Sequence, residues 1–285
     1  VQRLFEERFN VEFKPIFLGY GQSDDAKALM YASGELPDIS WEPDPSSVQQ
    51  FAANGFLCEL PLELILKHAP SYVKMVNRLA PTAWLLSYWN GANYGIPNLW
   101  LDGQHPGPGV WRKDWLLKVG ITNVPETIEE MHFALKKFVE DDPDGNGKRD
   151  TCGLSAPMVY WAAFNEIYGA YGMAPYNWME NDGKAVWGGI RPETKETLAT
   201  LQQWYAEGLL HQDFLSDDHE KHAQKFVNGK IGYLTGGAMD LEPEKENSMT
   251  AKTRALCAAP KAELVSGVFP KGPRGERGAW CWGGV

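Results

Sequence analysis

The segment VPETIEEMHFALKKFV, residues 124–139, predicts a long capped helix, and the fold class follows from this helix together with the strands around it. Thr127 and Glu130 form a capping box, in which each side chain accepts a hydrogen bond from the other residue's backbone N–H, and the helix is expected to run to Val139. Further along, residues 231–235 are predicted as a strand that leads into two glycines. Strands that alternate with helices in this way predict mixed α/β layers.

Turn and cap residues predict two further elements. Asn90-Gly91 is typical of a hairpin turn, and the runs on either side of it, residues 84–89 and 93–97, are predicted as its strands. Pro192 indicates the first turn of a helix that ends at Gly208.

Composition excludes several classes of protein. The chain has 285 residues, with 27 Lys and Arg against 37 Asp and Glu, so its formal net charge is −10. Binding to nucleic acid needs clustered basic residues, and the sequence contains no such stripe, so we expect no nucleic-acid partner. The most apolar window, residues 154–164, is shorter than the ~18 residues of a membrane span and contains Pro157. At ~150 residues per domain, the length predicts about two domains.

An acidic loop predicts a calcium site. The segment DPDGNGKRD, residues 142–150, has oxygen side chains at positions 1, 3, 5 and 9 of an EF-hand loop and glycine at position 6. Position 12, where an EF-hand has a bidentate glutamate, is Gly153, so either a carboxylate from elsewhere completes the site or the site is weaker. A solvated turn is the alternative. We expect a structural Ca²⁺ held by the side chains of Asp142, Asp144, Asn146 and Asp150 and the backbone carbonyl of Lys148.

Aromatic residues are abundant, with 12 Trp, 11 Tyr and 12 Phe. A sugar presents an apolar C–H face to an indole ring and hydroxyl groups to neighbouring polar side chains. Trp111, Trp115 and Trp204 fall in regular helix or strand patterns and are expected in the core. Five tryptophans at strand ends or beside Gly, Pro and Asn are as much candidates for ligand contact as for packing: Trp41, Trp100, Trp161, Trp178 and Trp282.

The spacing of the cysteines does not indicate a zinc site, and the sequence lacks the common catalytic motifs that would identify an enzyme class. The four cysteines lie far apart in the sequence, at positions 58, 152, 257 and 281. The sequence does not decide whether they are buried free thiols or whether two of them form a disulfide. The sequence contains neither a Walker loop nor a Gly-x-Ser-x-Gly motif. The paired carboxylates of a glycosidase come together in space rather than in sequence, so an enzyme stays an alternative.

Seven short motifs follow one another along nearly the whole chain. They are ASGELPDI at 32–39, NGFLCEL at 54–60, NYGIP at 93–97, WRKDWL at 111–116, VPET at 124–127, FVNGKIG at 226–232 and FPKGPRGERG at 269–278. This ordered set resembles the extracellular solute-binding proteins of ABC importers, in the sugar-binding group that includes the maltodextrin- and alginate-binding proteins. The calcium-like loop makes the chain most similar to the oligosaccharide subgroup of the alginate-binding type.

The resemblance implies an α/β fold of two lobes joined by crossing hinge strands (type II), with the ligand in the cleft and hinge closure over it. By order along the chain, residues 1–109 would form the first lobe and residues 110–258 the second, which carries the loop at 142–150. Residues 259–285 would return to the first lobe. Members of the family begin earlier and continue further, so the chain is expected to be the middle of a longer polypeptide.

The resemblance also implies which residues contact the sugar. Carried over by position, these are Trp41, Asp44, Trp100, Asp102, Tyr160, Trp161, Asp240, Trp280 and Trp282, to which Trp178 is added from its sequence setting alone.

The implied function is capture of an oligosaccharide by aromatic stacking and hydrogen bonds, without covalent chemistry. The protein would be an extracellular monomer, periplasmic or a cell-surface lipoprotein, and would present its cargo to the membrane permease of an ABC importer. The acidic charge favours a neutral glycan, and uronates stay open. The alternatives are a glycoside hydrolase or lyase with the same tryptophan-rich cleft, and a protein-binding module that uses exposed aromatic residues.

Overall fold

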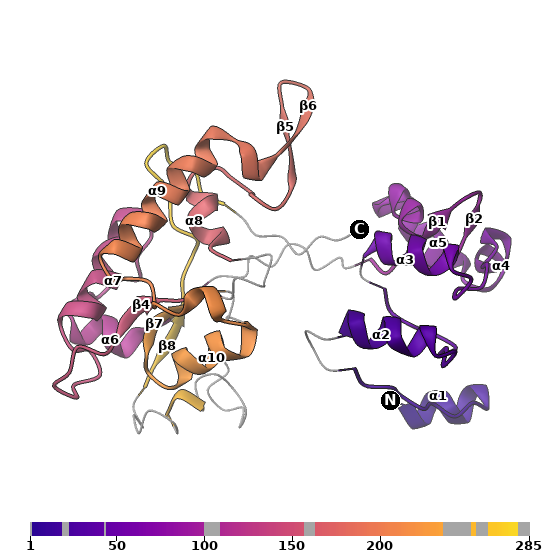
Figure 1. Ribbon diagram of the computed structural model, residues 1–285, viewed down its shortest axis with the longest axis horizontal. Helices are drawn as coiled ribbons and strands as arrows, with labels where there is room; N and C mark the ends of the chain where they lie inside the picture. The colour runs from indigo at the N-terminus through magenta and orange to yellow at the C-terminus, as the bar shows by residue number, and fades with distance from the viewer. Residues whose placement is uncertain are drawn as a thin grey trace. The chain divides into compact units, whose positions relative to one another are not determined.

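The computed structural model describes residues 2–18, 23–42, 44–99, 109–156, 163–235, 252–254 and 262–278 of the chain (Figure 1). The chain divides between Trp100 and Leu101 into two compact units. Unit 1 contains the described residues up to 99, and unit 2 contains those from 109 onwards. No helix within these described ranges is long and apolar enough to cross a membrane.

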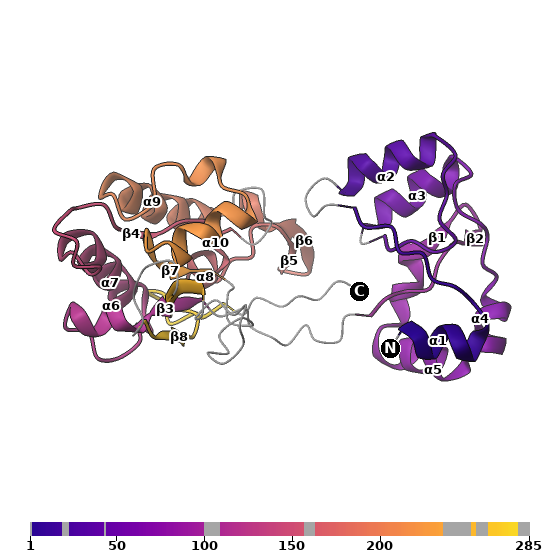
Figure 2. The ribbon, with the colours of Figure 1, turned by 90° about the horizontal axis from the view of Figure 1, so that it is seen from below.

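Unit 1 is built mainly of helices, which enclose a small aromatic core. Tyr31 is buried, and its ring lies edge-on to Phe51, with 4.8 Å between ring centroids, and to Phe56, with 5.9 Å. The elements of unit 1 are α1 (Gln2–Phe9), α2 (Ser23–Ala32), α3 (Pro45–Ala53), α4 (Leu62–His68), α5 (Pro70–Leu79), the 3-10 helix η1 (Pro81–Ser87) and the strands β1 (Tyr88–Trp89) and β2 (Ala92–Asn93) (Figure 2).

The predicted hairpin of unit 1 is confirmed at its turn but is shorter than expected. β1 and β2 pair antiparallel, and Asn90 and Gly91 between them have positive φ angles of 47° and 89°, as a type I′ turn requires. Most of the run at 84–89 is 3-10 helix instead of strand. Pro81 stands at the start of this helix, where its fixed φ suits the first helical turn.

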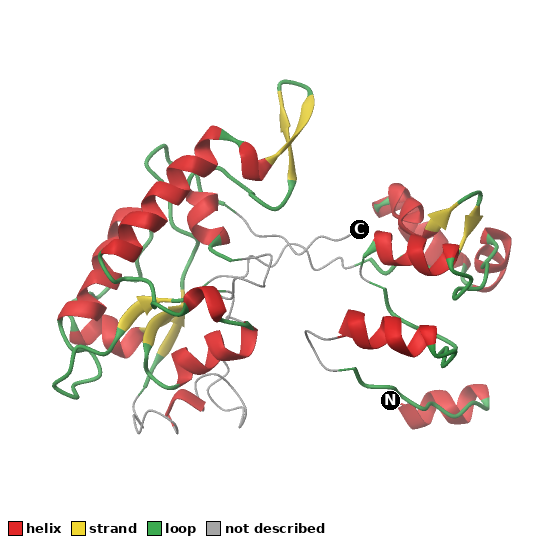
Figure 3. Ribbon diagram, in the orientation of Figure 1, coloured by secondary structure: helices red, strands yellow, loops and turns green. Residues whose placement is uncertain are grey.

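Unit 2 contains a four-stranded mixed sheet with the strand order β4-β7-β3-β8. Its elements are β3 (Val110–Arg112), α6 (Lys113–Lys118), α7 (Ile128–Glu140), β4 (Cys152–Leu154), α8 (Asn165–Ala170), β5 (Trp178–Asn181), β6 (Lys184–Trp187), η2 (Gly188–Ile190), α9 (Pro192–Ala206), η3 (Phe214–Ser216), α10 (His219–Val227), β7 (Ile231–Leu234) and β8 (Leu264–Ser266). β4 and β7 are parallel, whereas β3 is antiparallel to both β7 and β8. α7 packs against β4 and β7, and α10 packs against β7 (Figure 3).

The core of unit 2 joins side chains of the sheet to side chains of α7. Trp111, Trp115 and Trp204 are all buried, which confirms the prediction. The Trp111 ring lies 4.5 Å from that of Tyr233, and the Trp115 ring lies 5.5 Å from that of Phe138.

The predicted capping box of α7 is confirmed. Thr127 Oγ1 accepts a hydrogen bond from the backbone N–H of Glu130 (3.1 Å), and Glu130 Oε2 accepts one from the N–H of Thr127 (3.2 Å). α9 likewise begins at Pro192, as predicted, and Gly208 follows its end with a φ of 75°.

Residues 262–278 are the described part of the segment expected to return to the first lobe, and they pack within unit 2. β8 pairs with β3, and the backbone of Lys271 exchanges hydrogen bonds with Glu126 and Ile128. Gly278 lies so close to Gly169 that a Cβ atom on Gly278 would be 2.3 Å from the Gly169 Cα. The lobe boundaries at residues 109 and 258 stay a prediction.

The described cysteines are free thiols. Cys58 is exposed and Cys152 is half-buried. Cys257 and Cys281 lie outside the described residues.

Candidate functional site

Three of the predicted sugar contacts, Trp41, Asp44 and Trp178, belong to the described residues. The others lie outside them: Trp100, Asp102, Tyr160, Trp161, Asp240, Trp280 and Trp282. Each unit is therefore described by itself: Trp41 and Asp44 belong to unit 1, and Trp178 and the acidic loop belong to unit 2.

Trp41 lies between α2 and α3 of unit 1, and 59% of its surface is exposed. Its backbone carbonyl is fixed, because the oxygen accepts a hydrogen bond of 3.0 Å from the Lys27 ammonium group. An exposed indole on a fixed backbone offers a flat apolar surface to a sugar ring.

Asp44 caps the start of α3. Its Oδ1 accepts a hydrogen bond from the backbone N–H of Ser46 (3.0 Å), and its Oδ2 accepts one from the Ser46 hydroxyl (2.6 Å). An aspartate directly before a proline at a helix start is a common sequence signal for such a cap. Both carboxylate oxygens thus serve the helix, and a sugar contact by Asp44 stays a prediction.

Lys27 and Glu42 form a buried ion pair beside Trp41 that the sequence did not indicate. Their charged atoms lie 3.0 Å apart, and only 10% and 8% of the two side chains are exposed. Tyr31 and Ser40 donate hydrogen bonds of 3.2 and 3.0 Å to the other oxygen of Glu42. Burial raises the pKa of Tyr31, so its hydroxyl remains protonated and can donate. Lys27 and Glu42 are fifteen residues apart in the sequence, so no local sequence pattern predicts the pair.

Trp178 lies at the start of the β5–β6 hairpin and is 70% exposed. Trp187 stands directly opposite it, with 5.7 Å between the ring centroids and an angle of 68° between the rings. Asp182 and Gly183 turn the hairpin with φ angles of 50° and 75°, and the N–H of Gly183 donates to the Glu180 carboxylate (2.6 Å). The paired indoles make one side of the hairpin aromatic.

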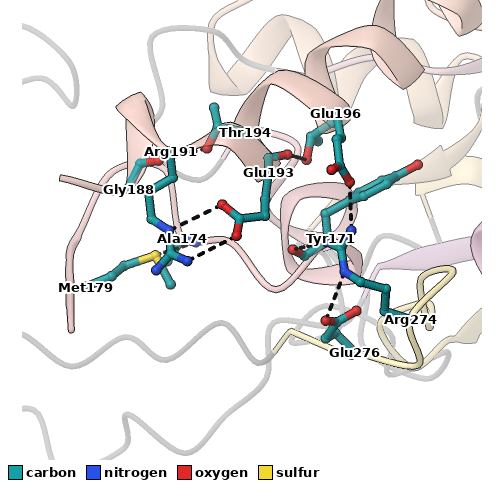
Figure 4. A network of polar contacts seen from close by, with 11 residues as sticks. Tyr171, Ala174, Met179, Gly188, Arg191, Glu193, Thr194, Glu196, Arg274 and Glu276 are labelled. Carbon is teal, nitrogen blue, oxygen red and sulfur yellow. Dashed lines mark hydrogen bonds and ion pairs between the residues drawn. The ribbon is translucent and has the colours of Figure 1, made fainter. Parts of the chain in front are cut away.

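The base of this hairpin is held by α9 (Figure 4). The Thr194 hydroxyl donates a hydrogen bond of 2.7 Å to the backbone oxygen of Gly188, which directly follows β6. Arg191, at the start of α9, pairs with Glu193 at 3.1 Å. The pKa of Glu193 is lowered by the hydrogen bond from Arg191. The hairpin is therefore fixed to α9 at the end of β6.

Arg274 ties the chain beyond β8 to the same region (Figure 4). Its guanidinium contacts Glu196 on α9 at 2.7 Å and Glu276 at 3.2 Å, and it donates to the backbone oxygen of Tyr171 at 3.1 Å. Three segments that are far apart in the sequence are joined by one side chain.

The acidic loop folds around its own carboxylates. The Asp142 carboxylate accepts hydrogen bonds from the backbone N–H groups of Gly145, Asn146 and Gly147 at 2.9–3.1 Å. The bond from Gly147 is the main cause of a lowered pKa of Asp142, whereas burial, with Asp142 beside it, raises the pKa of Asp144. Gly147, at EF-hand position 6, has a φ of 76°, which a glycine adopts readily.

The side chain of Asn146 bridges two of these carboxylates. Its amide nitrogen donates to Asp144 Oδ2 at 2.7 Å and to Asp150 Oδ1 at 2.9 Å. Lys230 also pairs with Asp150 at 2.8 Å, and this bond is the main cause of the lowered pKa of Asp150. The positive end of the Asn146 amide dipole and the Lys230 ammonium thus face carboxylates that would otherwise repel one another.

Three carboxylates, an amide and a carbonyl are the oxygen donors that Ca²⁺ prefers, so the loop fits this ion in its chemistry. Within the described ranges, no group of three or more His, Cys, Asp or Glu side chains is arranged to hold a metal. Gly153, at EF-hand position 12, lies in β4, and a Cβ atom there would be 2.9 Å from the backbone oxygen of Leu209. A glutamate therefore has no room at position 12.

Glu166 is a buried carboxyl group that no sequence motif indicated. It lies in the first turn of α8, and its Oε1 accepts a hydrogen bond of 2.5 Å from the Thr235 hydroxyl at the end of β7. Burial raises the pKa of Glu166 to about 7. Only its position at the start of α8, among apolar residues that are themselves buried, could have signalled this burial.

Comparison with known proteins places these features in a family context. The model of the bacterial extracellular solute-binding protein family matches residues 1–280. The polygalacturonan/rhamnogalacturonan-binding protein YtcQ of Bacillus subtilis is 31% identical over 284 residues, which are 98% of this chain and 53% of YtcQ. The chain spans about half the length of the curated relatives it matches.

Three solved structures show the same fold. The Streptococcus pneumoniae ABC-transporter substrate-binding protein FusA in complex with kestose matches with a TM-score of 0.68 and 19% identity over 99% of this chain and 57% of FusA. An EF-hand mutant of FusA matches with a TM-score of 0.66. The alginate-binding protein AlgQ2 without calcium ion matches with a TM-score of 0.62 and 19% identity over 90% of this chain and 51% of AlgQ2. The expected α/β fold of the two-lobe solute-binding type is confirmed.

Proposed function

Because the chain belongs to the bacterial extracellular solute-binding protein family, we propose that it captures an oligosaccharide and presents it to the membrane permease of an ABC importer. The family is one of binding proteins, so the alternative of a glycoside hydrolase or lyase loses its support. The observation that carries the proposal is the exposure of two indoles: Trp41, whose backbone carbonyl accepts a hydrogen bond from Lys27, and Trp178, on a hairpin whose other strand is followed by Gly188, which Thr194 holds. Flat, exposed and preset aromatic surfaces suit the stacking of sugar rings.

The ligand class follows from charge and from the relatives. FusA was solved with kestose, a neutral sugar, whereas YtcQ is named for binding polygalacturonan and rhamnogalacturonan, which are acidic glycans. The formal net charge of −10 disfavours a polyanionic ligand, so we infer a neutral oligosaccharide. A uronate-containing oligosaccharide is the second candidate, favoured by the higher sequence identity of YtcQ.

The proposed sugar contacts are Trp41, Asp44, Trp100, Asp102, Tyr160, Trp161, Trp178, Asp240, Trp280 and Trp282. Stacking on the tryptophans would supply most of the affinity, and carboxylates at the ring edges would accept hydrogen bonds from hydroxyl groups. The protein would act as a monomer outside the cell, as a periplasmic protein or a lipoprotein.

A calcium ion is also part of the proposal. The loop at 142–150 would bind Ca²⁺ through Asp142, Asp144, Asn146, the carbonyl of Lys148 and Asp150. Support comes from Asp144 and Asp150, whose carboxylates both accept hydrogen bonds from the Asn146 amide, and from two solved structures of the same fold, an EF-hand mutant of FusA and AlgQ2 without calcium ion. The ion would hold the loop together and would take no part in sugar binding.

A glycan panel tests the function. Kestose, maltotriose and a galacturonic acid trimer are each added to the purified protein, and the melting temperature, the Kd by calorimetry and the release of reducing ends are measured. We expect one neutral sugar to raise the melting temperature saturably with no new reducing ends. Preference for the galacturonic acid trimer would select the second ligand class, and no binding to any glycan, or measurable turnover, would overturn the proposal.

A further inference from the structure

We propose that the buried pair Lys27–Glu42 is a positioning device, a clamp that fixes the backbone of Trp41 and presets its indole for stacking on the ligand. This inference rests on the proposed function, in which Trp41 contacts a sugar. Lys27 and Glu42 themselves do not need to touch the ligand.

The contacts form a short chain from the core of unit 1 to its surface. Lys27 Nζ donates one hydrogen bond of 3.0 Å to the Trp41 carbonyl and another of 3.0 Å to Glu42 Oε2. Glu42 Oε1 accepts hydrogen bonds from Tyr31 and Ser40. Tyr31 is in turn packed against Phe51 in the aromatic core. The carbonyl of Trp41 is therefore linked to the core through the ammonium group of Lys27.

The residues in this series of contacts differ sharply in how much of each side chain is exposed. The Lys27 and Glu42 side chains are about nine-tenths buried, whereas Trp41, which directly precedes Glu42, has more than half of its surface exposed. An exposed indole gains little stability from its own packing, so its orientation depends on the backbone that carries it. Here that backbone is held at the carbonyl of Trp41 and at the side chain of the next residue.

Stability alone gives no reason for the pair. Removing two charges from water costs free energy that their attraction repays only in part, and apolar residues of similar size are often at least as stabilising. A lysine does supply one thing that an apolar side chain lacks, which is a donor for the Trp41 carbonyl. The buried charge pair is thus explained by what it fixes.

A preset aromatic side chain improves affinity because less motion is lost when the ligand binds. The cost of ordering one side chain and its loop corresponds to about a fivefold to tenfold change in Kd. Loss of the clamp should therefore weaken sugar binding by about this factor while the indole itself is still present.

The test is a double-mutant cycle that removes the clamp without leaving a buried charge. Lys27→Met with Glu42→Gln keeps the size of both side chains, and the new amide oxygen at position 42 can still accept the bonds from Tyr31 and Ser40. Kd for the best glycan of the panel is measured for this double variant, for Trp41→Ala and for the triple variant. We expect the double variant to bind about fivefold to tenfold more weakly than the unsubstituted protein, and to have no further effect once Trp41 is alanine. Equal affinity of the double variant, or additive losses in the triple variant, would overturn the inference.

A second readout needs no ligand. With 5-fluorotryptophan incorporated, the ¹⁹F resonance of Trp41 is assigned by its loss in Trp41→Phe. We expect this resonance to narrow and to move towards the position of the free amino acid when the clamp is removed. An unchanged Trp41 resonance in a folded double variant would overturn the inference even if no glycan binds.

A matched control uses an exposed pair of the same chemistry. Lys113 and Glu263 in unit 2 lie 2.8 Å apart, with about half of each side chain exposed. Lys113→Met with Glu263→Gln should leave both Kd and the Trp41 resonance unchanged, and an equal effect of this control would overturn the inference. Failure of the unsubstituted protein to bind any glycan would instead overturn the proposed function and leave the ¹⁹F result to decide the clamp.

Discussion

Gly153 lies so close to Leu135 that a Cβ atom at position 153 would be 2.7 Å from the Cβ of Leu135. The acidic loop thus leads directly into a buried strand that packs on α7, instead of into the exposed helix that follows an EF-hand loop. Whatever completes a calcium shell in this loop must come from outside position 12.

Substituting this glycine tests the packing. Gly153→Ala should lower the free energy of unfolding by about 1–3 kcal/mol because the core is overpacked. Gly153→Glu should lower it further, since it also buries a carboxylate. Urea unfolding measures both changes. A Gly153→Glu variant that is as stable as the unsubstituted protein and binds calcium more tightly would show that position 12 is open after all.

Calcium should stabilise unit 2. A chelator is expected to lower the melting temperature, and calcium at about a hundred times its Kd is expected to restore it by roughly 5–10 °C. Asp144→Asn should imitate the chelator because it removes one of the carboxylates that converge on Asn146. Calorimetric scans with and without calcium provide the measurement.

Asp182→Asn is the control for calcium, since it removes an exposed charge at the β5–β6 turn and leaves the acidic loop intact. Its melting temperature should respond to calcium as that of the unsubstituted protein does. Melting that is indifferent to chelator and to calcium would mean that the loop is only a turn.

Glu166 should make stability fall as the pH rises. Burial raises its pKa from an ordinary 4.5 to about 7, so between these values the folded chain holds a proton that the unfolded chain has lost. The resulting stabilisation is complete below about pH 4.5 and disappears as the pH rises through 7, and it amounts to up to about 3 kcal/mol.

Glu166→Gln should remove this pH dependence, because the amide stays neutral throughout. Urea unfolding at pH 5.5 and pH 8 should show a smaller difference for Glu166→Gln than for the unsubstituted protein. Glu129→Gln, at an exposed position on α7, should leave the difference intact. An identical pH profile for Glu166→Gln and the unsubstituted protein would contradict a neutral buried carboxyl group.

Trp178 should matter for binding and hardly at all for stability. Trp178→Ala is expected to weaken glycan binding about tenfold, as loss of an aromatic anchor does. Its melting temperature should change by only about 1–2 °C, because most of the ring is exposed. Leu198→Ala on α9, where about half of the leucine is exposed, is the control and should change neither quantity. Unaltered affinity in Trp178→Ala would exclude this indole from the site.

Local patterns predicted the parts of the fold that depend on neighbouring residues. The capping box at Thr127 and Glu130 starts α7, and Asn90-Gly91 turns a hairpin, because both devices need only residues within one turn of chain. Trp111 and Trp115 were assigned to the core correctly, since their apolar spacing matches one buried face.

Contacts between distant segments could not be predicted in the same way. The Lys27–Glu42 pair joins α2 to the loop before α3, and Arg274 contacts residues more than seventy positions away. Asp44 caps α3 through a local contact with Ser46, and its predicted contact with a sugar stays a prediction.

The strand order of unit 2 also bears on how a growing chain behaves during synthesis. β3 is synthesised before both of its neighbours in the sheet, since β8 lies about 150 residues later in the chain and β7 about 120 residues later. Until the ribosome has released both, β3 presents unpaired backbone groups on each edge, which can recruit a strand from another nascent chain. Because β3 has only three residues, Val110–Arg112, few unpaired backbone groups are available for pairing with another chain.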